Sequence, residues 1–388
     1  MKILRVMGSV NPETGGPIEG LLRTSEAMAK MGCANEVLCL DSPSEPWIAD
    51  FPLPVHALGP GIGKYRYIPA FHRWLRARAR DYDGVILHGL WNYSSLGAWR
   101  ALAGTATPYA IFVHGMMDPW HRQFSPLKHI AKQLFWLGLE GRVLADAYAV
   151  LFTTKEEQEA ARNMFWGHPY RGRVVAYGTA DVPDGGPAHI AKFRHAVPAL
   201  GDRPYVLFLS RIHPKKGCDI LLDGFQTVAA QNADLDLVVA GPDQVGWKQE
   251  LIGRAKNLGI SDRIHWPGML AGDMKWGALR GAEAFILPSH QENFGIAVAE
   301  ALLCGTPVLI SDKVNIWKDV EEALCGIVST DTAQGVTEML SRFMALDAAG
   351  RQSMRLAARE TFLRRFDART AARDLMSLVE EMRHAGRG

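Results

Sequence analysis

Two carboxylates eight residues apart, Glu292 and Glu300, are the side chains of this chain best placed to do chemistry. Their segment, 285–309, predicts a strand, a polar loop, a short helix that Gly295 opens, a turn and a further strand. A loop that enters a helix N-terminus binds anions, because free N–H groups and the helix dipole point at the ligand. Carboxylates repel such an anion unless they bind hydroxyl groups on neutral parts of the same ligand. The pattern therefore favours a phosphate between two polyols, which is a nucleotide sugar.

Two cations, Arg211 and Lys216, form a second constellation in the loop after the predicted strand 205–210. Arginine offers a planar fork of donors and lysine a point charge, and together they suit a diphosphate. A solvated basic turn would have the same composition. The diphosphate interpretation is favoured because this loop and the loop with Glu292 both follow strands of one predicted sheet.

Glycines and histidines follow the predicted strands of the first half. Gly15 and Gly16 come after the strand 2–7, and paired glycines let the backbone approach a ligand closely. His88 and His114 end two later strands, where their rings would face a ligand cleft. Each feature also has a plainer interpretation, an ordinary turn for the glycines and a structural role for a histidine at a strand end.

Metal and nucleophile motifs give no competing site. D-x-D pairs occur at 81–83 and 234–236, but each precedes a strand and so lies at the wrong end of the sheet. The chain shows no HExxH, CxxC or paired-histidine spacing, no GxSxG elbow and no GxxxxGK[ST] loop. We expect no metal and no cofactor, the nucleotide sugar being a co-substrate.

The elements that must position these residues alternate between strand and helix, which is typical of a parallel sheet covered on both faces. A turn-rich linker, 178–204, separates two doubly wound halves, and such halves bind ligands at the carboxyl ends of their strands, here in a cleft between two sheets. The expected strands are 2–7, 36–40, a short one near 56, 85–88, 109–114, 147–153, 205–210, 235–240, 263–266, 284–287, 308–310 and 326–328. The expected longer helices are 18–31, 69–80, 95–103, 127–145 and most of 332–384.

The composition, 48% hydrophobic and 22% charged over 388 residues, is that of an ordinary globular chain, and its length predicts about two domains. A net charge of +2 gives no reason to expect nucleic acid as a partner. Five cysteines without CxxC spacing fit buried thiols in a reducing cytoplasm. The first residues predict a strand rather than a signal peptide, and no run of about 20 apolar residues predicts a membrane span.

Basic and aromatic residues gather in the segments 65–80 and 127–142. They fit ordinary solvated helix faces, and they also fit a peripheral membrane patch, since Arg and Lys beside Trp and Phe suit anionic headgroups. The expected location is cytoplasmic, with peripheral contact to the inner membrane surface under the second interpretation.

Segment 288–308 has the pattern Pro-Ser-x2-Glu-x-Phe-Gly-x4-Glu-Ala-x3-Gly-x-Pro-Val. It resembles the Glu-x7-Glu signature of the retaining GT-B glycosyltransferases of family 4, which include bacterial mannosyl- and glucosyltransferases. The segment from Arg211 to Lys216-Gly217 resembles the diphosphate-binding loop of that family. The glycine pair at 15–16 and His114 are similar to its N-terminal glycine loop and N-domain histidine. The resemblance runs nearly end to end.

The resemblance implies a GT-B fold of the α/β class, in which two Rossmann-like, doubly wound parallel-sheet domains face a central cleft. Residues 1–185 would form the acceptor-side domain and residues 200–366 the nucleotide-sugar-binding domain. The last helix, at about 367–388, would cross back to the N-terminal domain.

The resemblance also implies roles for single residues. Glu300 would hold the ribose hydroxyls and Glu292 the donor sugar, while His114 would contact that sugar near its reacting carbon. Glu292 and His114 are therefore the expected catalytic residues. The other residues expected to bind the donor are Gly15, Gly16, Arg211, Lys216, Met269 and Leu270 (near the base), Asn293, Phe294 and Gly295.

The implied activity is transfer of a hexose from a UDP- or GDP-sugar to a lipid-linked or growing polysaccharide or glycolipid acceptor, with retained anomeric configuration and without a metal. One alternative is a GT-B-like sugar-nucleotide 2-epimerase, which would need a richer set of acid–base residues in the cleft. Another is a non-catalytic partner subunit with this fold. The intact set Glu292, Glu300, Arg211 and Lys216 argues against that subunit.

Overall fold

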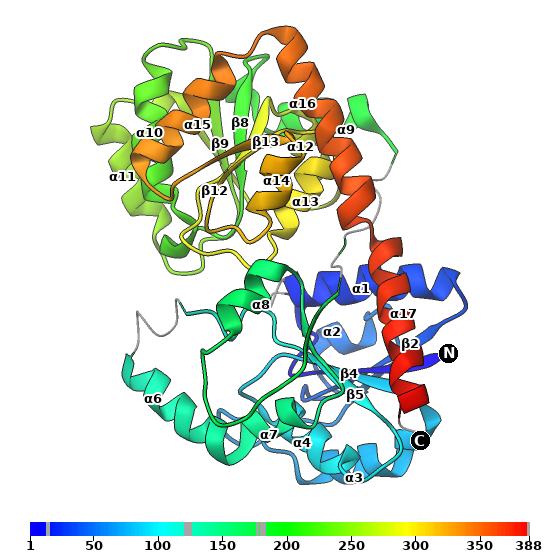
Figure 1. Cartoon of the computed structure of the whole chain (residues 1–388). Coiled ribbons are helices and arrows are strands. Elements are labelled where there is room, and N and C mark those ends of the chain that lie inside the picture. Colours follow the sequence, from blue (N-terminus) through cyan, green and yellow to red (C-terminus); the bar gives the residue numbers. More distant parts are fainter. Residues whose placement is uncertain (13–15, 120–125, 176–177, 179–183, 386–388) are drawn as a thin grey trace. The chain divides into compact units, whose positions relative to one another are not determined.

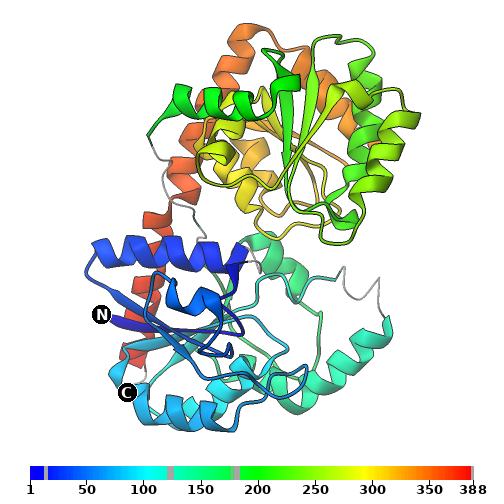
Figure 2. The same cartoon turned by 180° about the vertical axis from the view of Figure 1, so that it is seen from behind.

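The structure is a computed structural model that describes residues 1–12, 16–119, 126–175, 178 and 184–385 (Figure 1). Contacts divide the chain into unit 1, residues 1–180 with 367–388, and unit 2, residues 181–366. Each unit is built on one parallel sheet with helices on both of its faces, as Figure 2 shows from behind. The predicted α/β class is therefore confirmed.

Unit 1 has, within the described ranges, a seven-stranded sheet in the order β3-β2-β1-β4-β5-β6-β7 with all pairs parallel. The strands are β1 (Lys2–Met7), β2 (Ala34–Cys39), β3 (Val55–Ala57), β4 (Gly84–His88), β5 (Tyr109–Phe112), β6 (Val150–Phe152) and β7 (Gly172–Val174). The strand order reverses between β1 and β4, which makes this position the switch point where doubly wound sheets bind ligands.

The helices of unit 1 fall on the two faces of this sheet. They are α1 (Gly16–Lys30), α2 (Pro46–Ala49), α3 (Pro69–Arg78), α4 (Tyr93–Leu102), α6 (Pro126–Phe135), α7 (Gly141–Ala145), α8 (Lys155–Ala161) and α17 (Ala368–Ala385), with a 3₁₀ turn η2 (Ala79–Asp81) and a π turn η3 (Trp136–Glu140). Helices α1 and α17 pack on each other over one face (Figure 1). Buried apolar residues of α17 recur at the three- and four-residue spacing of a helix face, from Ala368 through Leu375 to Met382.

The expected helix 127–145 forms in the structure, with a π turn in its middle. The π turn η3 separates α6 from α7 and buries Trp136 and Glu140. Burial raises the pKa of Glu140 to about 7, although its carboxylate accepts a hydrogen bond of 2.6 Å from the Ser95 hydroxyl. Strand β7 escaped prediction, because only Val174 among its three residues is apolar.

Unit 2 has, among the residues described, a six-stranded parallel sheet in the order β10-β9-β8-β11-β12-β13. Its strands are β8 (Tyr205–Leu209), β9 (Asp236–Ala240), β10 (Ile264–Gly268), β11 (Ala284–Leu287), β12 (Val308–Ser311) and β13 (Gly326–Ser329). Its helices are α9 (Gly186–Ala196), α10 (Cys218–Ala229), α11 (Lys248–Asn257), α12 (Gly272–Gly281), α13 (Ile296–Leu303), α14 (Trp317–Glu322), α15 (Ala333–Met344) and α16 (Ala348–Thr361), with short turns η4 (Pro198–Leu200), η5 (Pro214–Lys216), η6 (Ser261–Arg263) and η7 (Phe362–Phe366). Its switch point lies between β8 and β11.

The turn-rich linker expected at 178–204 is wrong for residues 186–196, which form α9. Gly185 precedes this helix and Pro187 lies in its first turn, where proline is tolerated because the N–H it lacks would have no helical partner. Phe193 is buried as α9 packs on α12. The Gly-Gly-Pro sequence is thus a helix start. Across the described part of the chain, no helix combines the length and apolar character that a bilayer crossing requires.

Candidate functional site

The switch point of unit 2 brings Lys216 and Glu292 together. Lys216 follows β8 and Glu292 follows β11, and these strands are hydrogen-bonded neighbours. The Lys216 ammonium donates a short hydrogen bond to Oε2 of Glu292, which makes a salt bridge. Residues that are 76 positions apart in the sequence therefore meet at one ligand-binding edge.

Two contacts hold the loop from Arg211 to Gly217 in place. The Lys215 N–H donates to Nδ1 of His213 at 3.1 Å, and this bond caps η5. Gly217 has φ +69°, and a Cβ atom there would lie 2.3 Å from the carbonyl oxygen of Pro288 at the end of β11. Only glycine fits this close approach. The contact fixes the loop that carries Lys216 against the segment that leads to Glu292.

The charges of this pair are mostly withdrawn from water. The Lys216 side chain is 5% exposed and that of Glu292 is 21% exposed. Burial by itself would raise the pKa of Glu292, but the Lys216 charge and hydrogen bond, with the nearby Lys215 charge, hold this pKa below its ordinary value. Glu292 is therefore an ionised carboxylate at neutral pH.

The loop after Glu292 leads into the N-terminus of α13. The Asn293 N–H donates to Oε1 of Glu292 at 3.1 Å, and the buried Phe294 packs edge-on against Phe366. Gly295 precedes α13 with φ +75°, a conformation that glycine adopts without strain. Lys216 and the dipole at the N-terminus of α13 both favour a negatively charged group at this edge.

Glu300 lies inside α13 and is 4% exposed. Its Oε1 accepts a hydrogen bond of 2.5 Å from Nζ of Lys275, a residue of α12 whose ammonium also lies 4.4 Å from the centre of the Trp276 ring. Lys275 was missed by the sequence analysis. In the sequence, Lys275 is a basic residue on the helix before β11, and nothing there distinguishes it from a lysine that faces solvent.

The other predicted residues of unit 2 lie on neighbouring loops. Arg211 is exposed, and its Nη1 donates to Oε1 of Gln244 in the loop after β9 at 3.1 Å. After β10, Met269 is 74% exposed whereas Leu270 is buried. Met269 is thus available to a ligand, while Leu270 supports the loop from inside.

In unit 1, Gly16 begins α1, and Gly15 lies outside the described residues. His114 follows β5 with φ +48° and is partly exposed. Its Nε2 lies 2.9 Å from Nδ1 of His88, at the end of the neighbouring β4. His88 in turn accepts a hydrogen bond of 3.1 Å from Nε of Arg5, a buried residue of β1 that the sequence analysis did not single out.

The D-x-D pairs have structural partners. Asp83 accepts a hydrogen bond from the Lys2 backbone N–H at 2.8 Å. Asp236 is fully buried at the start of β9, forms salt bridges with Arg203 and Arg263, and is hydrogen-bonded to Nε2 of His265 at 2.8 Å. These contacts tie strands to their flanking segments. Among the residues described, no three His, Cys, Asp or Glu side chains group as metal ligands would.

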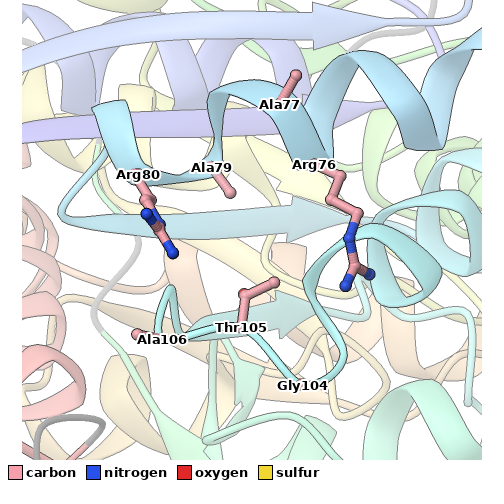
Figure 3. A pocket seen from close by; sticks show the side chains of 7 residues that line it. All are labelled: Arg76, Ala77, Ala79, Arg80, Gly104, Thr105 and Ala106. Atoms are coloured by element: carbon pink, nitrogen blue, oxygen red, sulfur yellow. The ribbon is translucent and has the colours of Figure 1, made fainter.

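A pocket of about 380 Å³ lies elsewhere on unit 1 (Figure 3). Arg76 and Arg80 of α3 and η2 line it from one side and the loop 104–106 from the other, with both guanidinium groups pointing toward that loop. This loop leads into the amino end of β5, whereas His114 follows the carboxyl end of the same strand. None of the predicted site residues lines this pocket.

Two family models match the chain in succession. Residues 15–178 match the model described as glycosyl transferase 4-like domain, and residues 190–361 match glycosyl transferases group 1. The second match includes Arg211, Lys216, Glu292 and Glu300. The two matches together cover most of both units.

Known proteins are similar along most of the chain. The D-inositol 3-phosphate glycosyltransferase of Actinosynnema mirum is 25% identical over 343 residues, which are 81% of this chain and 80% of that protein. The sucrose-phosphate synthase of Thermosynechococcus elongatus has a similar fold, with a TM-score of 0.79, 18% identity and coverage of 99% and 100% of the two chains. Anabaena HepE in complex with UDP-glucose also has a similar fold, with a TM-score of 0.76, 19% identity and coverage of 98% of this chain and 100% of that chain. The chain therefore belongs to the group 1 glycosyltransferases of family 4, enzymes of the GT-B fold that transfer a sugar from a nucleotide sugar.

Proposed function

We propose that this enzyme transfers a hexose from a UDP- or GDP-sugar with retained anomeric configuration and without a metal. The observation that carries the proposal is the Lys216–Glu292 pair at the switch point of unit 2, beside the N-terminus of α13. In this assignment Lys216 and Arg211 hold the diphosphate, Glu292 and the backbone at 293–295 hold the sugar, and Glu300 holds the ribose hydroxyls. UDP-glucose, which HepE binds, is the first donor to test.

The proposed chemistry uses fixed positive charge in place of a metal ion. The bond between the anomeric carbon and the diphosphate oxygen breaks, and the electron pair leaves with the nucleoside diphosphate. Lys216, Arg211 and the dipole of α13 stabilise the charge that develops on that oxygen. The acceptor oxygen attacks from the face that the diphosphate leaves, and its proton passes to the departing phosphate.

Donor binding has to redistribute the ion pairs of this site. The Lys216 ammonium would bind both Glu292 and the diphosphate, because an ammonium group has three N–H donors. Glu300 would turn one carboxylate oxygen to the ribose while Lys275 keeps the other. In unit 1, Gly15, Gly16 and His114 are assigned to the donor sugar side. The acceptor is assigned to the neighbourhood of Met116 and the segment 88–91.

The proposal is tested by release of nucleoside diphosphate from a panel of UDP- and GDP-sugars, with and without glycan acceptors and with EDTA present. We expect release in EDTA from one donor, abolished by Lys216→Ala and by Arg211→Ala. The matched control is Lys192→Ala, which removes an exposed lysine of the same unit that pairs with Asp273. Epimerisation of the sugar without transfer would establish the 2-epimerase instead. Full cellular function of both active-site variants would establish a non-catalytic subunit.

For the acceptor we propose a lipid-linked or growing polysaccharide or a glycolipid at an anionic membrane surface. Helix α6 supports this, because its apolar side chains Leu127, Ile130 and Leu134 are 81%, 58% and 67% exposed and follow each other on one helix face. Lys128 is exposed on the same helix. An exposed apolar stripe with basic residues is typical of helices that lie in a membrane interface.

Sedimentation with vesicles tests the membrane contact. The wild-type protein should bind vesicles that contain anionic lipid and should be released by salt, because surface attraction is screened. Replacing both Leu127 and Leu134 with Ser should abolish binding, while the same change at the exposed Leu356 of unit 2 should leave it intact. Equal binding of all three proteins would refute the role of α6 and leave the donor assignment untouched.

A further inference from the structure

Arg5 is a charged residue in the middle of a central strand. It lies in β1 between Ile3 and Met7, which point to the same face of the sheet, and it is 2% exposed. A buried charge is costly unless it is paired or hydrogen-bonded. The position calls for an apolar side chain, so the arginine needs an explanation beyond packing.

The contacts of Arg5 lead to His114 in two steps. Arg5 pairs with Ile86 in the register of β1 with β4, which places Arg5 and His88 on the same face of the sheet. Nε of Arg5 donates to Nε2 of His88 at 3.1 Å, and Nδ1 of His88 lies 2.9 Å from Nε2 of His114. The ring of Phe112 is stacked on both imidazoles, with centroids 5.4 and 5.3 Å away.

The direction of both hydrogen bonds follows from the arginine. A guanidinium Nε always carries a hydrogen and cannot accept, so Nε2 of His88 must be the acceptor. A neutral imidazole has one N–H, which His88 must therefore carry on Nδ1, and it donates this hydrogen to Nε2 of His114. Because Nε2 of His114 accepts this hydrogen bond, the single N–H hydrogen of the neutral His114 ring lies on Nδ1.

We propose that Arg5 and His88 are positioning residues that hold His114 as the neutral Nδ1–H tautomer, so that the ring acts toward the sugar donor as a hydrogen-bond donor through Nδ1 and not as a base. The part that concerns the sugar rests on the proposed function. The tautomer itself depends only on the contacts within unit 1.

The relay also opposes a second proton on His114. A hydrogen on its Nε2 would face the Nδ1–H of His88 across 2.9 Å, so that two donors would meet. Burial and the Arg5 charge lower the pKa of His114 to about 3, and the same causes lower the pKa of His88 well below its ordinary value. Both rings are therefore neutral at pH 7.

The backbone of His114 is held as firmly as its ring. The buried carboxylate of Glu157 accepts hydrogen bonds from the Gly115 N–H at 2.6 Å and from the Thr153 N–H at 2.7 Å. This clamp joins the loops that follow β5 and β6 and supports the left-handed backbone of His114, φ +48°. A histidine that served only to fill space would need neither the clamp nor the relay.

Imidazole nitrogen NMR of the 15N-histidine-labelled full-length chain tests the tautomer without any substrate. The His114 signals are assigned by their loss in His114→Asn. We expect a protonated Nδ1 and an unprotonated Nε2 for His114 in the wild-type protein, and a shift toward the Nε2–H form in Arg5→Met. An Nε2–H tautomer in the wild type, or no change in Arg5→Met, would overturn the proposal. The wild-type result decides the matter even where the variant does not fold.

Kinetics with the accepted donor test what the tautomer does. His88→Asn keeps an N–H donor near the position of Nδ1, whereas His88→Phe keeps a ring without a donor. We expect His88→Phe to lower kcat by about 10–100-fold, the range known for residues that orient metal-bound histidines, and His88→Asn to retain more activity. A purely structural role predicts the opposite order, because Phe fills the space of the ring better.

The matched control is His56→Phe, since His56 bonds to Glu36 and lies outside the relay. It should leave kcat unchanged, and equal losses in His56→Phe and His88→Phe would count against the relay. If no donor is turned over by the wild-type protein, the proposed function fails. The NMR measurement still decides the tautomer in that case.

Discussion

Removing the Lys216 ammonium should destabilise the protein strongly at neutral pH. In Lys216→Met, Glu292 would keep its negative charge in a site where its side chain is only 21% exposed. Breaking a buried ion pair by removing one partner costs about 3–5 kcal/mol, and the partial exposure of Glu292 lowers this to about 2–4 kcal/mol. Urea unfolding followed by tryptophan fluorescence and circular dichroism at pH 7 measures the difference.

The cost should shrink as the pH falls. In the wild type the pKa of Glu292 is depressed, so the pair contributes stability above the ordinary carboxyl value of 4.5 and loses it as the pH falls through the lower folded value. Without Lys216, burial still raises the pKa of Glu292 while the two largest causes that lower it are gone, so the folded variant takes up a proton at a higher pH than the folded wild type. The difference between variant and wild type should therefore be smaller at pH 5 than at pH 7.

A control variant and a double variant test whether the unpaired charge of Glu292 causes the loss of stability. Lys192→Met removes the lysine of an exposed pair, with side chains 57% and 47% exposed, and should change the urea midpoint little. The double variant Lys216→Met with Glu292→Gln should recover most of the lost stability, because the unpaired charge is gone. Equal destabilisation in the two lysine variants, or a cost for Lys216→Met that does not vary between pH 5 and pH 7, would refute the reasoning.

Three further outcomes are expected. Gly217→Ala should lower the melting temperature and weaken binding of the nucleoside diphosphate, UDP or GDP, that the accepted donor releases, as calorimetry would measure, because its Cβ would lie 2.3 Å from the Pro288 carbonyl oxygen at φ +69°. Glu140→Gln should flatten the pH profile of stability. The folded pKa of Glu140, about 7, lies above the ordinary value of 4.5, so the stability of the wild type falls by on the order of 3 kcal/mol as the pH rises from 4.5 to 7. Melting temperatures at pH 5 and pH 8 would reveal this fall in the wild type and its absence in the variant. Leu375→Ala should cost about 2–5 kcal/mol in urea unfolding because the side chain is 1% exposed, and Arg373→Ala on the exposed face of α17 should cost little.

The fold class could be predicted because it depends on local pattern. The run 2–7 and the run 284–287 have the same bounds in the sequence analysis and in the structure, since a strand buried on both faces is mostly apolar, with Arg5 as the buried exception in the run 2–7. The same pattern missed α9, where Gly-Gly-Pro suggested a turn and the deciding contact, Phe193 against α12, is made far along the chain.

The candidate site likewise contains residues that the sequence pattern could predict and residues that it could not. Lys216 and Glu292 were recognisable because each follows a strand, and the sheet then brings them together. Arg5 and Lys275 were not recognisable, because their importance comes from partners 83 and 25 residues away. A buried arginine in a strand looks like any other residue of an amino-terminal segment until the register of β1 with β4 is known.

The position of α17 has a consequence for synthesis on the ribosome. This helix supplies Leu375, Leu378 and Met382 to a core whose other members, among them Ile3 and Ile86, are translated first. All of unit 2, residues 181–366, must be made in between. At 5–20 residues per second this interval lasts about 10–40 s. During that time the nascent unit 1 exposes the apolar face that α17 later covers, so chaperone binding to this face should end only when the last helix has emerged.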